Sequence, residues 1–256
     1  MVPITVVIPT LDEAGRIEAC IASARWAGEI IVADGGSSDA TVQVARQAGA
    51  TVLERCGPTI AAQRNTAIAR AAYPWVLALD ADELVSPGLA SELATVAGAP
   101  AHGAYRIRRQ NFYLERELTR GHWGHDWIVR FFPRELRYTE QRVHESLEPV
   151  ADVGTLHGTI LHEPYRDLPH HAAKMMRYSE WGAQDLFDRG RRASLADLLL
   201  RPAWRFIKTW ILQGSILDGR YGVINAGLGA SASFYKYAYL WDLEQRQRAL
   251  HRKRTA

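Results

Sequence analysis

The chain has 256 residues, of which 47% are hydrophobic and 23% charged, and this composition is that of a globular protein with a substantial core. A formal net charge of +3 is too small to favour nucleic acid as a partner. The two cysteines, Cys20 and Cys56, lack metal-type spacing, and no leader-type segment precedes the first apolar run. Together these features predict a reduced, cytoplasmic setting.

Residues 1–100 alternate between strand and helix patterns. Strands are expected at 4–8, 29–33, 51–53 and 75–79, and helices at 17–24, 40–48 and 60–72. Short links between alternating elements predict a mainly parallel sheet that is covered by helices on both faces. The sequence contains neither a Gly-x-Gly-x-x-Gly fingerprint nor a Walker motif, which disfavours a dinucleotide or P-loop site.

Acidic residues follow three of these strands. Glu13 lies just beyond the first strand, Asp34 ends the second, and Asp80-Ala81-Asp82 ends the fourth. Because ligands of such sheets bind outside the carboxyl ends of the strands, we expect these acids to surround one site. In an extended backbone Asp80 and Asp82 would share a face, and such a pair favours Mg²⁺ or Mn²⁺. A solvated acidic turn is the alternative for this motif taken alone.

Four motifs in order resemble family 2 glycosyltransferases with the GT-A (Rossmann-like) fold. They are Val7-Ile8-Pro9-Thr10-Leu11-Asp12-Glu13, Asp34-Gly35-Gly36-Ser37-Ser38-Asp39, Arg64-Asn65 and Leu79-Asp80-Ala81-Asp82-Glu83. The resemblance implies that Pro9, Thr10 and Glu13 line a nucleotide pocket and that Asp34 accepts a hydrogen bond from the base. It also implies that Arg64 lies near the diphosphate or base, Asp80 near the ribose, and Asp82 on the metal.

Beyond residue 100 the pattern predicts antiparallel or mixed strands at 105–109 and 127–132, and a further strand at 156–162. Residues 123–145 and 165–168 resemble a bacterial subfamily that extends the lipopolysaccharide core. That resemblance implies a carboxylate general base, for which Glu145 is the first candidate and Asp126 the second. An ion pair with Arg142 or a histidine is the structural alternative for Glu145.

The C-terminal part is predicted to be helical and amphipathic. Asp167 can cap a helix that runs from 168 to 189 and stops at Gly190. Residues 195–213 place a stripe of Arg201, Arg205 and Lys208 beside an apolar face, which is too charged to span a membrane but suits an anionic membrane surface. Packing against the catalytic domain or against a second copy, as a homo-oligomer, is the alternative.

Taken together, these patterns predict an α/β GT-A domain over residues 1–165, with a nucleotide-sugar half (1–100) and an acceptor half (101–165), followed by a helical extension over 166–256. The expected activity is inverting, metal-dependent transfer of a hexose from a nucleotide-diphosphate sugar, with UDP the expected nucleotide, to a lipid-linked saccharide such as lipopolysaccharide core. The expected location is the inner face of the cytoplasmic membrane. A nucleotidyltransferase and a non-catalytic nucleotide-sugar-binding scaffold are the alternatives.

Overall fold

The computed structural model describes residues 1–139 and 146–255. The chain forms two compact units. The first comprises Met1–Asn111 with Asp126–Glu163, and the second comprises Phe112–His125 with Pro164–Ala256.

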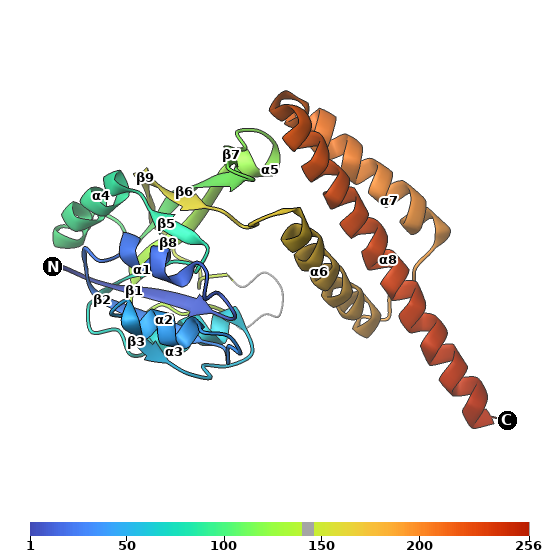
Figure 1. Ribbon diagram of the computed structural model, residues 1–256, viewed down its shortest axis with the longest axis horizontal. Coiled ribbons are helices and arrows are strands. Elements are labelled where there is room, and N and C mark those ends of the chain that lie inside the picture. The colour runs from blue at the N-terminus through green and yellow to red at the C-terminus, as the bar shows by residue number, and fades with distance from the viewer. Residues whose placement is uncertain (140–145, 256) are drawn as a thin grey trace. The chain divides into compact units, whose positions relative to one another are not determined.

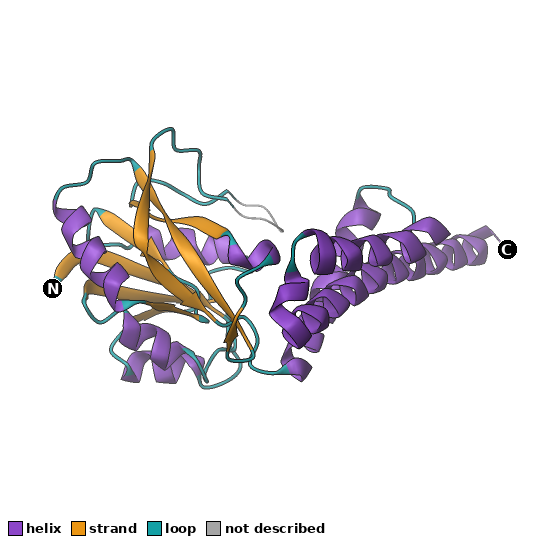
Figure 2. Cartoon of the chain, turned by 90° about the horizontal axis from the view of Figure 1, so that it is seen from above, coloured by secondary structure: helices purple, strands orange, loops and turns teal. Residues whose placement is uncertain are grey.

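The first unit is a mixed sheet flanked by helices (Figure 2). Its strands are β1 (Val2–Thr10), β2 (Ala27–Asp34), β3 (Thr51–Leu53), β4 (Trp75–Ala78), β5 (Glu83–Val85), β6 (Ala104–Tyr113, which ends in the second unit), β8 (Asp126–Pro133) and β9 (Val153–His162). Its helices are α1 (Ile17–Ser23), α2 (Thr41–Gln47), α3 (Ile60–Ile68) and α4 (Pro87–Gly98). The sheet order is β3-β2-β1-β4-β8-β6-β9-β5. Strands β1 to β4 pair in parallel, as do β6 and β9, whereas β8 runs antiparallel to β4 and β6.

Helices cover both faces of the sheet, as the alternating pattern predicted. Side chains of β1 alternate between the faces, so that Ile4, Val6 and Ile8 join one core cluster while Val7 joins the other. The first cluster takes apolar residues from α1, α2 and α4, and the second takes them from α3. Every residue of β4 is buried, because this strand lies inside the sheet with helices above and below it.

The strand register brings the predicted motifs to one edge. Thr10 at the end of β1 pairs with Asp34 at the end of β2. On the other side of β1, Val7 pairs with Ala78, so the chain leaves β4 at Leu79 and Asp80 on this same edge. The prediction that these strand ends meet is therefore confirmed, and it follows from parallel pairing alone.

The second unit is helical apart from a short hairpin (Figure 1). Its elements are β7 (Arg116–Glu117), α5 (Gly121–Gly124), α6 (Leu168–Asp188), α7 (Leu195–Ile207), the π-helical turn η1 (Lys208–Leu212), the 3₁₀ turn η2 (Ser215–Asp218) and α8 (Gly219–Thr255). Both α6 and α7 pack along α8. None of the helices in the described ranges is long and apolar enough to cross a membrane.

Local sequence explains where these helices begin and end. Asp167 caps α6 by accepting a hydrogen bond of 2.7 Å from the His170 N–H, and Gly190 follows the helix at a φ of 71°. Ser194 and Asp197 form a reciprocal capping box at the start of α7. The helices predicted at 168–189 and 195–213 are confirmed, and the second continues beyond α7 into η1.

An aromatic cluster joins residues 112–125 to the helical unit. The Tyr113 hydroxyl lies 2.9 Å from His171 Nδ1, and the Tyr165 ring stacks on His171 with centroids 3.7 Å apart. Trp123 lies 6.0 Å from both Tyr113 and Tyr165, centroid to centroid. These long-range contacts explain why a segment that the sequence placed inside a continuous domain of residues 1–165 belongs to the second unit.

Candidate active site

The chain turns sharply after β4. The Glu83 N–H donates to the Asp80 carbonyl over 3.0 Å, which closes a turn that leads directly into β5. The expectation of an extended Asp80-Ala81-Asp82 segment is therefore wrong. The turn is required because β5 must pair with β9 at the far edge of the sheet. As a result Asp80 and Asp82 face different partners.

Asp80 is held by two arginines. Arg130 Nη2 lies 2.5 Å from Asp80 Oδ2, and Arg64 donates to Oδ1. Burial raises the pKa of Asp80, but Arg130 and Arg64 outweigh this effect and hold that pKa far below its ordinary value. Asp80 is therefore ionised throughout the working pH range. Arg64, which we predicted to lie near the diphosphate or base, contacts this carboxylate and lies 4.7 Å over the Tyr138 ring.

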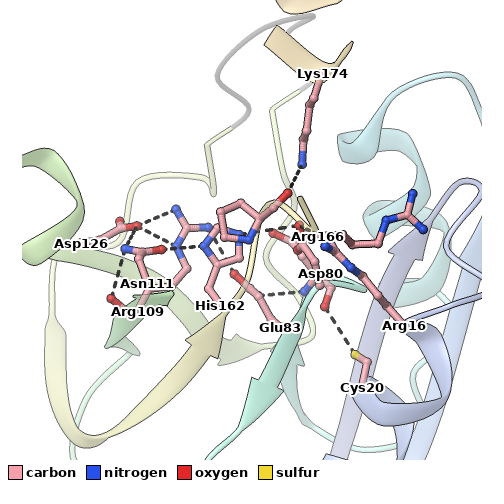
Figure 3. Close-up of polar contacts among 12 residues, drawn as sticks. Arg16, Cys20, Asp80, Glu83, Arg109, Asn111, Asp126, His162, Arg166 and Lys174 are labelled. Carbon is pink, nitrogen blue, oxygen red and sulfur yellow. Dashed lines mark hydrogen bonds and ion pairs between the residues drawn. The ribbon is translucent and has the colours of Figure 1, made fainter. Parts of the chain in front are cut away.

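Glu83 is fully buried and contacts both Asp80 and Arg130 (Figure 3). Its Oε2 accepts the Asp80 N–H at 2.8 Å, and its Oε1 lies 3.2 Å from Arg109 Nη1 and 3.6 Å from Arg130 Nη2. Burial lowers the pKa of Arg130, but Asp80 and Glu83 raise it well above the ordinary value. The turn thus has a fixed shape and a local charge balance before any ligand binds.

Asp126, the second candidate for the base, begins β8. Arg109 Nε and Nη2 each lie 2.7 Å from Asp126 Oδ2, and Asn111 Nδ2 donates to the same oxygen over 3.3 Å. All three contacts involve Oδ2, and Oδ1 has no hydrogen-bond partner in the described part of the chain. Oδ2 is therefore held in place, while Oδ1 can accept a proton. Glu145, the first candidate, lies outside the described residues.

Asp82 faces a histidine that the sequence analysis did not identify. Its Oδ2 lies 3.7 Å from His162 Nε2 and 3.9 Å from Arg16 Nη1. His162 Nδ1 lies 2.6 Å from the Asn111 carbonyl oxygen Oδ1, an acceptor, so Nδ1 carries the proton. Nε2 is thus the ring nitrogen on the Asp82 side, and in the neutral imidazole this nitrogen can ligate a metal ion.

These residues fit a divalent cation that is shared with substrate. The described residues contain no cluster of three or more ligand-type side chains, so an all-protein cage is absent from them. One carboxylate is nevertheless sufficient for Mg²⁺ or Mn²⁺, which complete their coordination with water and substrate phosphates. Asp82 and His162 are the residues that would hold the ion.

The loops after β1 and β2 form the part of the edge that was predicted to bind the nucleotide. Pro9 and Thr10 are buried, and Thr10 Oγ1 has no hydrogen-bond partner within the described ranges. The Glu13 N–H donates to Thr41 Oγ1 at 2.8 Å, and Asp12 Oδ1 accepts the Ser38 N–H at 2.7 Å. These bonds tie the loop after β1 to the loop after β2 and form a continuous rim.

Asp34 holds the loop after β2 in place through its carboxylate. Its Oδ2 accepts the N–H groups of Gly36 and Ser37 at 2.8 and 2.9 Å, and its Oδ1 accepts the Ser37 hydroxyl at 2.5 Å. A Cβ at Gly35 would lie 2.4 Å from Nε2 of Gln63, so a larger residue here would displace the end of that side chain. The predicted contact of Asp34 with a base would therefore add to bonds that already organise its loop.

The site contains basic and imidazole groups that sequence reasoning missed. They are Arg16, Arg109, Arg130 and His162. One signal was available, because Arg130 is a lone charge within the apolar strand pattern of residues 127–132. The others come from segments that only the fold brings to this edge. The Arg16 amino groups Nη1 and Nη2 are buried and, in the described part of the chain, have no hydrogen-bond partner.

Comparison with known proteins identifies the class. Residues 5–152 match the model of glycosyl transferase family 2, and the chain belongs to that family. It is a glycosyltransferase with a GT-A-type α/β domain, which confirms the predicted fold class and sets aside the nucleotidyltransferase alternative.

Two relatives extend over nearly the whole chain. The lipopolysaccharide core biosynthesis glycosyltransferase LpsC of Rhizobium meliloti is 26% identical over 94% of this chain and 92% of its own length. An uncharacterized glycosyltransferase of Rickettsia typhi is 25% identical over 97% and 90%. Glucosyl-3-phosphoglycerate synthase of Mycobacterium tuberculosis, solved with Mn²⁺ and UDP, is 27% identical over 43% of each chain with a TM-score of 0.36, which does not establish a shared fold.

Proposed function

We propose that the protein transfers a hexose with inversion from a nucleotide-diphosphate sugar, a UDP-sugar in the first instance, to a hydroxyl of a lipid-linked saccharide such as lipopolysaccharide core. The transfer would depend on Mg²⁺ or Mn²⁺. The observation on which this proposal chiefly rests is the position of Asp82 Oδ2, 3.7 Å from His162 Nε2 at the strand edge.

Buried polar groups at this edge support a phosphate-bearing donor. The Arg16 guanidinium has two buried amino groups without hydrogen-bond partners in the described ranges, and its Nη1 lies 3.9 Å from Asp82. Buried donors are costly unless a ligand satisfies them. A diphosphate would accept from Arg16, and Thr10 Oγ1 would bond the nucleoside.

The chain's own groups then divide the chemistry. Asp126, with Oδ2 anchored by Arg109, or Glu145 would take the proton of the acceptor hydroxyl as it attacks the anomeric carbon from the face opposite the diphosphate. Arg16 would stabilise the negative charge that develops on the departing diphosphate. A bound divalent cation would supply further neutralisation of that charge.

The helical unit supports a lipid-linked acceptor. Side chains of Leu195, Leu199, Leu200 and Trp204 on α7 are exposed, each by 58% or more. Together with the basic stripe of Arg201, Arg205 and Lys208, they give α7 the composition of a helix that lies in an anionic membrane interface. The name of the LpsC relative agrees with a lipopolysaccharide-type acceptor.

The decisive experiment is a screen of nucleotide sugars for Mn²⁺-dependent hydrolysis, followed by transfer to a lipid A-core acceptor. We expect one UDP-sugar to be turned over. Asp82→Asn should lower turnover by about 10²-fold or more and remove metal-dependent donor binding in calorimetry.

The matched control is Asp152→Asn, which alters an exposed carboxylate whose ion-pair partner is His102 and should leave turnover unchanged. If Asp82→Asn keeps both turnover and metal-dependent binding, the metal assignment is wrong. If no nucleotide sugar is hydrolysed or stabilises the protein against thermal unfolding, the donor assignment fails.

A further inference from the structure

The helical unit contains a polar, partly open cavity of about 320 Å³, and none of its lining residues belongs to the sheet edge. Its lining residues come from α7, η1, η2 and α8, and α5 contributes Trp123. Its volume is in the range of small-molecule sites. All of its lining residues belong to the second unit, so the cavity is complete within that unit.

Two uncompensated cations line this cavity. Arg205 and Lys208 both face it, and neither has an ion-pair partner among the described residues. Arg201, one turn earlier on α7, differs because it is paired with Asp197. Burial lowers the pKa of the nearby Lys236, and Arg205 and Arg201 lower it further. This region therefore has an excess of positive charge, which an anion would neutralise.

The rest of the lining is suited to a saccharide. Gln213 and Asn225 supply amide groups, and Thr209 and Ser215 supply hydroxyls. The half-buried Trp123 offers an indole ring at the same cavity. Amide and hydroxyl groups can exchange hydrogen bonds with sugar hydroxyls, and an indole can cover the apolar face of a sugar ring. Cations, amides and an aromatic ring together fit a phosphorylated sugar better than they fit inorganic phosphate.

Exposed apolar residues alternate with lining residues along η1 and η2. Lys208, Thr209, Gln213 and Ser215 line the cavity. Ile211, Leu212, Ile216 and Leu217, which are their neighbours in sequence, are 51%, 63%, 48% and 68% exposed. Exposed side chains of this size are costly in water but favourable against acyl chains. A ligand with a phosphorylated head and a lipid tail would match both features.

We propose that this cavity binds the phosphorylated saccharide headgroup of the glycolipid acceptor, with Arg205 and Lys208 on the phosphate and the apolar residues of η1 and η2 in contact with its acyl chains. This inference rests on the proposed transfer to a lipid-linked saccharide and specifies a second point at which the acceptor is held. It does not involve the residues of the sheet edge.

The test is cosedimentation of the full chain with phosphatidylcholine vesicles that contain lipid A or dephosphorylated lipid A. We expect the wild-type protein to bind the phosphorylated lipid about tenfold or more tightly than the dephosphorylated one, because each hydrogen bond to a charged group can change the affinity by about tenfold. The double variant Arg205→Gln/Lys208→Gln should lose this preference. Arg205→Lys/Lys208→Arg, which keeps both charges, should retain most of it.

The matched control is Arg191→Gln/Arg192→Gln, which removes two exposed charges of the same unit outside the cavity and should keep the preference. Equal loss in this control, or no preference in the wild-type protein, overturns the proposal. Equal competition by soluble glucose 6-phosphate would overturn the assignment to a lipid. Calorimetry with UDP and Mn²⁺ tests the donor site separately. Failure of the proposed donor site can therefore be distinguished from failure of the proposed lipid-headgroup cavity.

Discussion

The sheet edge and the surface of α7 and η1 differ in whether their charged side chains form ion pairs. At the edge, Asp80, Glu83 and Asp126 each contact an arginine on another strand or helix, and every group in these contacts is buried or partly buried. Along α7 and η1, Arg205 and Lys208 have no ion-pair partner in the described part of the chain, and large apolar side chains are exposed beside them. The first region holds its carboxylates in ion pairs within its own unit, and the second leaves basic and apolar side chains exposed.

This difference is the one expected if the first region is the proposed transfer site and the second is the proposed membrane-facing surface. A transfer site must hold its carboxylates in one geometry before the substrate arrives, and buried arginine pairs do this at the cost of desolvation. A surface that meets a lipid keeps its apolar and basic groups available, because contact with the bilayer supplies their stabilisation. Substitutions in the two regions should therefore affect different measurements.

The largest expected effect concerns the general base. Of Asp126→Asn and Glu145→Gln, the one that removes the base should lower transfer by about 10² to 10⁴-fold while UDP binding in calorimetry is unchanged. The other variant should transfer at a nearly normal rate. If transfer survives in both, the base lies elsewhere, and the anchored Oδ2 of Asp126 then indicates a structural role for that residue.

Removal of Arg130 should be the largest stability effect. Arg130→Met removes the cation that Asp80 and Glu83 share, so that Arg64 alone pairs with Asp80 and Arg109 alone with Glu83, and it should lower the free energy of unfolding by about 3 to 5 kcal/mol in urea titration. Arg46→Gln breaks the exposed pair with Glu54 and should change it by about 1 kcal/mol or less. If Arg130→Met and Arg46→Gln lower the free energy of unfolding equally, the ion pairs of the sheet edge do not stabilise the fold more than an exposed pair does.

Membrane contact should be weakened by polar substitutions on α7. Leu199→Ser/Trp204→Ser, at two exposed positions, should lower affinity for anionic vesicles by about a hundredfold if both side chains enter the interface. Trp181→Ser on α6, at an exposed aromatic outside this surface, is the control and should have little effect. If vesicle binding is unchanged and a dimer dissociates in ultracentrifugation, the surface is a contact between copies of the chain.

The smallest effect is a pH dependence of stability from His171. Burial lowers its pKa to about 4, against about 6.5 in the unfolded chain, so the unfolded state binds the proton more tightly. Its contribution is complete above pH 6.5 and is lost as the pH falls towards 4. Between pH 8 and pH 5 the free energy of unfolding of the wild-type protein should therefore fall by about 2 kcal/mol more than that of His171→Phe. Equal losses in urea titrations at these two pH values would contradict the assignment.

Local patterns predicted the strands and helices of the first hundred residues and the meeting of three acidic strand ends, since both depend on short-range periodicity and parallel pairing. They also predicted the capped helix that begins after Asp167. The same patterns did not reveal the turn at Asp80, which arises because β5 pairs with a strand more than seventy residues away in sequence.

By itself, then, the sequence determined the GT-A class of the catalytic unit and the place where its acids gather, because these depend on periodicity and on motifs a few residues long. Only the tertiary structure decided which groups those acids meet. Arg109, Arg130 and His162 come from β6, β8 and β9, and their contacts with Glu83, Asp80 and Asp82 depend on strand order. The cavity beside Arg205 likewise exists only because α7, η1 and α8 pack together, since no local pattern specifies which side chains enclose a space between helices.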